Sequence, residues 1–275
     1  MFDMRTELGE AFGTKKARKA IKSVAENAIT GGVKMGTGEL AVVNSIKDST
    51  RDMATQEELQ AAVDQARPVP RANLDADEIQ DVYRPRDIIG SEVLKAIPIL
   101  DWQEAAKSLQ NIVCASRYVA NRIVRVANNE DAVQRLKVLR YMMWVIIFWH
   151  SARPGKMGTM SVGKREILRD NMVGAPEIVI ENIRRKFSDG GVMRKAHVDL
   201  LMTHCCVFAA IVDNFEILTL DLREDLKLEQ KQLNLYFAEV GARMSQKKVG
   251  DQVVHTAKFV LPLQFPKIRQ ARRRN

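Results

Sequence analysis

Two segments of the chain carry apolar side chains on nearly every side of the helix that each would form. The first, DAVQRLKVLRYMMWVIIFWH, covers residues 131–150, and the second, AHVDLLMTHCCVFAAIVDNF, covers 196–215. A helix at the surface of a protein keeps a polar face, whereas a helix that is apolar all round is buried. We therefore predict two long core helices in the part of the chain that follows residue 86.

Each predicted core helix is followed by a similar series of shorter elements. After the first come a polar segment, GKREILRDN, and an amphipathic one, APEIVIENIRRKF, in which Pro176 suits a first helical turn. After the second come LTLDLREDLKL, an expected strand and helix, LEQKQLNLYFAEVGARM, an expected third helix, and the strand-like VVHTAKFVLPLQF. A buried helix, a short helix, a recognition-like helix and a strand pair form the order of a winged helix.

This repeat predicts a mostly α fold with small β wings, organised as a tandem winged helix preceded by an extended linker with short helices. The expected boundaries are 1–85 for the linker, 86–190 for the first winged helix and 191–275 for the second with its basic tail. A plain α-helical bundle has the same periodicity and is the alternative architecture.

Residues 1–85 are assigned to a linker because they combine a glycine-rich segment, TGGVKMGTGEL, and several prolines with few large apolar residues. A short basic helix is expected near 15–28. Its cations crowd the first two turns, where positive charge opposes the helix dipole at a cost of up to about 1 kcal/mol each. A helix N-terminus can also bind phosphate. Two interpretations of this helix are therefore open, an anion-binding site and a basic face that is only solvated.

The charge of the chain favours an anionic partner, since the formal net charge is +9 and the pI is near 9.5. Residues 241–275 hold nine Lys and Arg against one acidic residue, whereas 1–85 hold 12 against 14. Three cysteines, two of them adjacent, fit a reducing compartment. The most apolar run, Tyr141 to Trp149, is about half the roughly 20 residues that span a bilayer, and we expect an intracellular protein without a membrane partner.

No motif in the chain predicts catalysis, a metal or a cofactor. GTMSVGKR, residues 158–165, has the spacing of a phosphate-binding loop, but Arg165 stands where a magnesium-binding Ser or Thr is required. His197 and His204 share a helical face, yet two ligands without a third are a weak metal site, and core histidines are the simpler interpretation. Cys205 lies in an apolar helix, where thiols are inert.

Nucleic-acid binding is the better supported chemistry, and its candidate residues are clusters of cations in the linker, after each predicted recognition helix and in the tail. The candidates are Lys15, Lys16, Arg18, Lys19, Arg184, Arg185, Lys186, Arg194, Lys195, Lys247, Lys248, Arg269, Arg272, Arg273 and Arg274. Lys and Arg in a tail contact phosphates without reading base edges, so we expect binding to double-stranded DNA that is largely independent of sequence. For the cations that end the first recognition-like helix, a favourable interaction with the helix dipole is an equally good explanation.

Four segments of the chain resemble a known family. They are RTELGEAFGTKKARKAI, ARPVPRANLDADEIQDVY, IVDNFEILTLDLREDLKL and the end FVLPLQFPKIRQARRR. In the same order along nearly the whole chain, they are similar to the 49-kilodalton-type subunits specific to RNA polymerase I, which are themselves similar to the β subunit of transcription factor IIE. Residues 100–195 match this family more by pattern than by residue.

The resemblance implies a non-catalytic subunit of the nucleus and nucleolus that supports initiation and elongation on ribosomal DNA. Members of the family consist of an N-terminal dimerisation module, a linker across the polymerase cleft and a tandem winged helix near upstream DNA. The β-rich dimerisation module is not found before residue 1, so docking of the usual heterodimer partner is not expected of this sequence, whereas contact with the polymerase core is. A free-standing winged-helix regulator of transcription is the alternative function, and an enzyme using residues 158–165 is a third.

Overall fold

The computed structural model of the protein describes residues 67–108, 114–129, 131–249 and 252–266. From Val69 onward these residues belong to one compact unit. The basic helix expected near 15–28 and the tail cations Arg269, Arg272, Arg273 and Arg274 lie outside the described residues.

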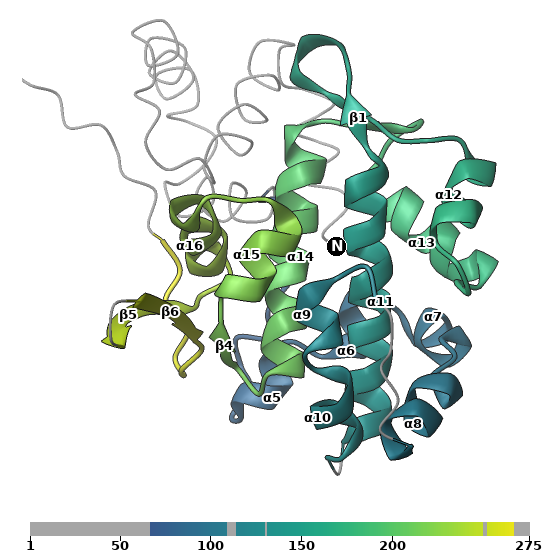
Figure 1. Ribbon diagram of the computed structural model, residues 1–275. Helices are drawn as coiled ribbons and strands as arrows, with labels where there is room; N and C mark the ends of the chain where they lie inside the picture. Colours follow the sequence, from purple (N-terminus) through teal and green to yellow (C-terminus); the bar gives the residue numbers. More distant parts are fainter. Residues whose placement is uncertain (1–66, 109–113, 130, 250–251, 267–275) are drawn as a thin grey trace, which may run out of the picture. The chain divides into compact units, whose positions relative to one another are not determined.

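Two long helices form the centre of the fold, as the sequence predicts. They are α11, Ala132–Ser151, and α14, Lys195–Val212, which lie side by side in Figure 1 and pack closely on each other. The rings of Tyr141 and Phe208 meet edge to face between them, with centroids 5.5 Å apart. By length and composition α14 could cross a membrane, but 72% of it is buried inside the protein, as expected of a core helix.

Short helices and one small sheet surround α11. Before it come α5 (Ile79–Val82), α6 (Pro85–Ile88), α7 (Ser91–Ala96), α8 (Leu100–Lys107), α9 (Arg117–Ala120) and α10 (Ile123–Ala127). After it come β1 (Arg153–Pro154), the 3-10 turn η1 (Lys156–Gly158), β2 (Met160–Ser161), α12 (Arg165–Asn171), α13 (Glu177–Phe187) and β3 (Val192–Met193). The three strands form an antiparallel sheet in the order β1-β2-β3.

The elements after α14 follow the predicted order. They are β4 (Glu216–Leu218), α15 (Leu220–Leu226), α16 (Gln230–Glu239), β5 (Arg243–Val249) and β6 (Gln252–Lys258). Strands β5 and β6 form a hairpin, and β4 pairs with β6, so the sheet order is β4-β6-β5. This arrangement of three helices and a three-stranded sheet is the one expected of a winged helix.

The structure confirms a mostly α-helical fold with small antiparallel sheets. The two halves differ, however, because the described part of the first half has strands of only two residues and places its hairpin before α12, not after the third helix. A tandem winged helix therefore stays our interpretation of the repeat, and so does the division at residues 190 and 191. Both halves contribute to a single continuous hydrophobic core.

Part of the predicted linker packs against this core. Val82 and Tyr83 are fully buried, the Tyr83 hydroxyl donates a hydrogen bond of 2.9 Å to the carbonyl oxygen of Val240, and its ring lies edge to face on Phe259. The prolines predict an extended segment, and extended chain does connect the short helices here. A single large aromatic side chain, Tyr83, is nevertheless enough to attach this segment to the core.

A buried ion pair joins α10 to the end of α14. Nε of Arg122 donates to both carboxylate oxygens of Asp213 at 2.8 and 2.9 Å, and the two side chains are only 6% and 4% exposed. Asp213 also accepts a hydrogen bond from the Tyr118 hydroxyl, and the Arg122 guanidinium stacks on the Tyr118 ring at 3.5 Å. Charges in this position are tolerated only because each is paired.

Removing one partner of this pair should destabilise the protein strongly. We expect Asp213→Ala to lower the free energy of unfolding by about 3 to 5 kcal/mol, because it leaves the Arg122 charge buried without its main partner. Denaturant unfolding measures this difference. The control is Asp81→Ala, which removes a half-exposed pair with Arg84 and should cost less than about 1 kcal/mol. If both variants lower the free energy of unfolding equally, the buried Arg122–Asp213 pair contributes no more to stability than the exposed pair.

Candidate nucleic-acid interface

The sheet of the second half has one buried and one basic face. Side chains alternate between the faces of a strand, and residues directly opposite each other in neighbouring strands share a face. Ile217 and Ala257 face the core and are fully buried. The outward face therefore carries Arg243 and Lys247 of β5 and Lys258 of β6, all three exposed.

Cations on this outward face are only partly neutralised. Nζ of Lys258 lies 3.0 Å from the Glu216 carboxylate, and this pair is more than half exposed. Arg243 is directly opposite Lys258 in the strand register, and two like charges in this position destabilise a sheet. Within the part of the chain that the structure describes, Arg243 and Lys247 form no ion pair. An external anion would relieve this repulsion.

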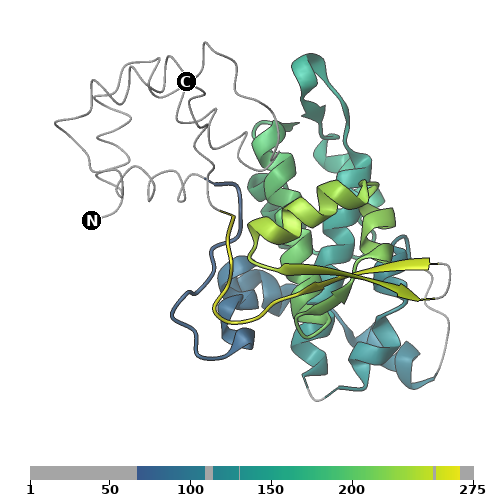
Figure 2. The ribbon, with the colours of Figure 1, turned by 90° about the vertical axis from the view of Figure 1, so that its left-hand side faces the viewer.

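Lys247 and Lys248 occupy the far end of β5, beside the turn of the hairpin, and both are exposed. The sequence predicts that the wing begins at these lysines, whereas the hairpin begins at Arg243. In Figure 2 the hairpin runs across the front of the helices, and its turn lies at their right-hand edge. Because Lys248 follows Lys247, it points to the opposite face of the strand. The two lysines thus present positive charge on both faces of the hairpin tip.

Helix α16 precedes this hairpin, in the place of a recognition helix, and its amides are engaged within the protein. Nε2 of Gln230 donates to Oδ1 of Asn234 at 2.7 Å and to the Thr219 hydroxyl at 3.1 Å. Amide side chains read adenine in the major groove only when both of their polar ends are available. The internal contacts favour phosphate binding over base reading.

Helix α13, the candidate recognition helix of the first half, shows a different electrostatic pattern. Its glutamates pair with arginines of α12: Arg165 lies 2.7 Å from Glu181 and Arg169 lies 2.7 Å from Glu177. The candidate cations also approach Glu181, with Arg184 at 3.9 Å and the exposed Arg185 at 3.8 Å. Four arginines thus share two glutamates, so Arg184 and Arg185 are partly neutralised and make a weaker phosphate surface than unpaired cations would.

Lys186 ends the same helix but its ammonium group is turned inward. Nζ donates to the carbonyl oxygen of Ile88, and burial lowers the pKa of this lysine. A side chain held in this way packs α13 against the chain that leads to α7. Lys186 is therefore a poor candidate for phosphate contact.

Arg194 and Lys195 lie at the start of α14, next to β3. Arg194 is half-exposed, 3.8 Å from Asp189, and Lys195 is partly buried. The basic sheet begins with β4 beyond the other end of this 18-residue helix, which is about 27 Å long at 1.5 Å per residue. The structure thus does not bring these two cations together with Lys247 and Lys248.

Sequence reasoning missed Arg243 and Lys258 as members of the basic face. Neither belongs to a run of like charges, which was the signal that selected Lys247 and Lys248. Period-two alternation along RMSQKKV and VVHTAK, combined with a strand register, places Arg243, Lys247 and Lys258 on one face.

The histidines considered for a metal site are part of the packing. Among the described residues, no group of three or more His, Cys, Asp or Glu is arranged to hold a metal ion. The His204 ring meets Phe187 and Phe208 edge to face, and its Nδ1 lies 2.7 Å from the Leu200 carbonyl oxygen. Burial, with a contribution from the Lys186 charge, lowers the pKa of His204 from 6.5 to about 3.

A pKa that is lower in the folded protein makes stability depend on pH. Below pH 6.5 the unfolded chain protonates His204 while the folded protein does not, so stability should fall as the pH drops from about 6.5 towards 3. We expect the difference in free energy of unfolding between pH 7.5 and pH 5 to be smaller in His204→Gln than in the wild type. His255→Gln, on β6 outside the core, is the control, and the same difference in all three proteins would contradict the prediction.

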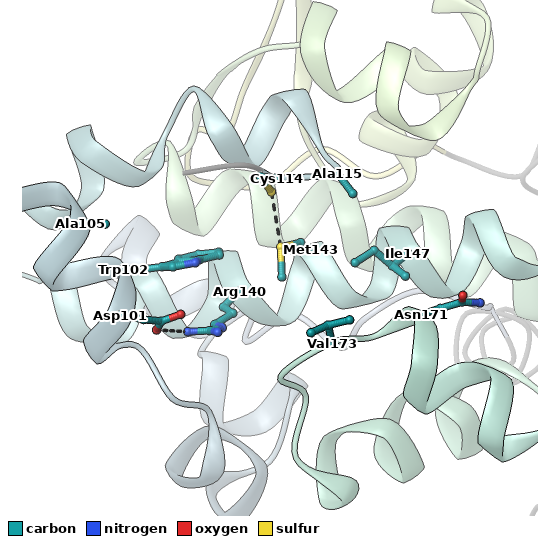
Figure 3. Close-up of a pocket in the computed structure, with 10 residues that line it drawn as sticks. All are labelled: Asp101, Trp102, Ala105, Cys114, Ala115, Arg140, Met143, Ile147, Asn171 and Val173. Atoms are coloured by element: carbon teal, nitrogen blue, oxygen red, sulfur yellow. Dashed lines mark hydrogen bonds and ion pairs between the residues drawn. The ribbon is translucent and has the colours of Figure 1, made fainter. Parts of the chain in front are cut away.

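The hollow in Figure 3 runs along one side of α11 and has a volume of about 360 Å³. Arg140 lies at one end, held between the rings of Trp102 and Trp144 at 5.1 and 5.4 Å, and it donates to Asp101 and to the Pro98 carbonyl. Cys114 approaches the Met143 sulfur at 3.4 Å, and burial raises the pKa of this thiol. Arg140 is already paired and the Cys114 thiol is not activated. The residues that line this hollow therefore contribute to packing and do not form a ligand site.

The described residues form a mostly helical protein with two small antiparallel sheets, one of which carries exposed cations on its outward face. The sequence model of the family of A49-like RNA polymerase I associated factors matches residues 1–266, and the chain belongs to this family. It is 31% identical to the DNA-directed RNA polymerase I subunit rpa49 of Schizosaccharomyces pombe, over all of this chain and 68% of that protein. It is 25% identical to the corresponding RPA49 subunit of Saccharomyces cerevisiae, over 87% of this chain and 59% of that protein.

Proposed function

We propose that the protein is a non-catalytic subunit of RNA polymerase I that grips double-stranded DNA through phosphate contacts and supports initiation and elongation of ribosomal RNA synthesis. Family membership and the names of the two yeast relatives support the polymerase assignment. The nucleus, and within it the nucleolus, is the corresponding location. The chain spans 68% and 59% of these relatives, so the activities of the whole protein are part of the proposal.

The observation that carries the DNA-binding part is the basic outward face of the β4-β6-β5 sheet. Arg243, Lys247 and Lys258 share this face, and Lys248 adds a charge at the tip. Exposed cations on a sheet face suit contact with the phosphates of a duplex. The amide of Gln230 on α16 is bonded within the protein, which limits base recognition. The linker cations Lys15, Lys16, Arg18 and Lys19 and the tail cations Arg269, Arg272, Arg273 and Arg274 remain candidates for further phosphate contacts.

Salt dependence of DNA binding tests this interface. We expect replacement of Arg243, Lys247, Lys248 and Lys258 by Ala to weaken binding equally for different duplex sequences. The slope of log K against log salt concentration should decrease by up to about 0.9 for each phosphate that the variant no longer neutralises. Fluorescence anisotropy of the full chain with two unrelated duplexes measures both quantities. Lys107→Ala, on α8, is the charge control, and an unchanged slope in the fourfold variant would refute the interface.

Co-purification separates the polymerase subunit from the alternative of a free-standing regulator. A subunit remains bound to the polymerase I core subunits through tagged purification at moderate salt, whereas a regulator is recovered alone. Recovery without any polymerase subunit would favour the regulator.

A further inference from the structure

A second projecting element lies in the first half of the fold. Strands β1 and β2 form a short hairpin that extends past the ends of α11 and α14 in Figure 1, at the opposite end of α14 from β4. It precedes α12 and so is distinct from the wing-like hairpin of the second half. Its tip is the turn η1, Lys156–Gly158.

The hairpin has a defined shape. The amide of Gly155 donates to the Thr159 carbonyl at 2.7 Å, and the Thr159 amide and hydroxyl both donate to the Lys156 carbonyl, at 3.1 and 2.7 Å. A Cβ atom on Gly155 would lie 2.8 Å from the Thr159 hydroxyl, so a larger residue there would force the Thr159 side chain to shift. These bonds close the turn across its base and fix the position of the residue at the tip.

Met157, at this tip, combines strain with full exposure. Its backbone is left-handed, with φ of 53° and ψ of 39°, a conformation that suits glycine and is unfavourable for a long side chain. Its side chain is completely exposed to solvent. A strained residue in a turn that its surroundings hold in place is a common feature of binding sites.

The charges around Met157 are positive. The chain from 152 to 165 contains no acidic residue, and Arg153 and Lys156 are exposed beside the tip. Arg165 is paired with Glu181, so it belongs to the body of the fold. Met160 of β2 is opposite Met193 of β3, which brings the half-exposed Arg194 to the base of the same small sheet.

We propose that the β1–β2 hairpin is a second DNA contact. Arg153 and Lys156 bind phosphates, and the side chain of Met157 inserts between two stacked base pairs. The proposal rests on the DNA-binding function proposed above. Apolar wedges that unstack a base step are typically Met, Leu, Ile, Phe or Pro, flanked by cations that hold the backbone on either side. A wedge must be presented rigidly, which the bonds of Gly155 and Thr159 achieve.

Insertion of the side chain is tested by fluorescence of 2-aminopurine placed in a duplex, with the full chain. Unstacking raises this fluorescence, so the wild type should produce an increase. Met157→Gly should abolish most of the increase while affinity changes less than about threefold and the salt slope is unchanged, because no cation is removed. Glycine suits the left-handed backbone, so this variant should retain the wild-type melting temperature. Val173→Ala, another exposed apolar side chain, is the matched control and should leave the increase intact.

Phosphate binding by the hairpin is tested separately with the double variant Arg153→Ala and Lys156→Ala. Its salt slope should decrease by up to about 1.8, that is 0.9 for each cation removed from a phosphate. A wild-type slope in this variant, or an undiminished 2-aminopurine signal in Met157→Gly, would overturn the hairpin proposal. If at the same time the fourfold variant of the other sheet still binds DNA more weakly, the proposed function stands and only the hairpin proposal fails. A wild-type chain that binds no DNA would remove both.

Discussion

Packing of α11 against α14 is the interaction on which the rest of the structure depends. Both helices are apolar on nearly all sides, so neither could be covered by the short elements of its own half alone. By burying the two helices against each other, the chain joins the repeated halves into one core, and the Arg122–Asp213 pair fixes the end of α14 to α10. The small sheets then project from a rigid body. Such a rigid body would serve the DNA contacts proposed for both hairpins.

How much of the fold the sequence predicts depends on whether the signal is local. The two core helices and the order of elements after α14 follow from periodicity, which a single chain displays directly. Burial of Tyr83 could not be predicted, because its partners, Val240 and Phe259, lie more than 150 residues away. The same holds for the two-residue strands β1 to β3, which are too short to show an alternating pattern and exist because α11 and α14 bring them together.

For the candidate interface, sequence reasoning identified charge but not its environment. A run of cations such as Arg184, Arg185 and Lys186 indicates a basic patch until tertiary contacts show Glu181 beside the arginines and a carbonyl group on the lysine. Lys247 and Lys248, in contrast, are exposed near the end of β5, beside the turn of the hairpin. Isolated cations such as Arg243 and Lys258 become a face only through strand register. The charge of a nucleic-acid surface is thus visible in composition, and its location is a tertiary property.

The protein treats its buried and its exposed cations differently. Arg122 and Arg140 are each held by a carboxylate and a backbone carbonyl of the same chain, and Lys186 is held by a carbonyl. On the β4-β6-β5 sheet, however, Arg243 stands opposite Lys258, and at the η1 turn Met157 keeps an unfavourable backbone beside Lys156. Both arrangements are unfavourable and lie at the surface. A neutral residue in place of Arg243 would remove the charge repulsion, and glycine in place of Met157 would remove the backbone strain, without a change in the core. Local rules are most often broken where something binds. The two sites therefore agree with the proposed DNA contacts, in which phosphates bind the cations of the sheet and a base step takes up Met157.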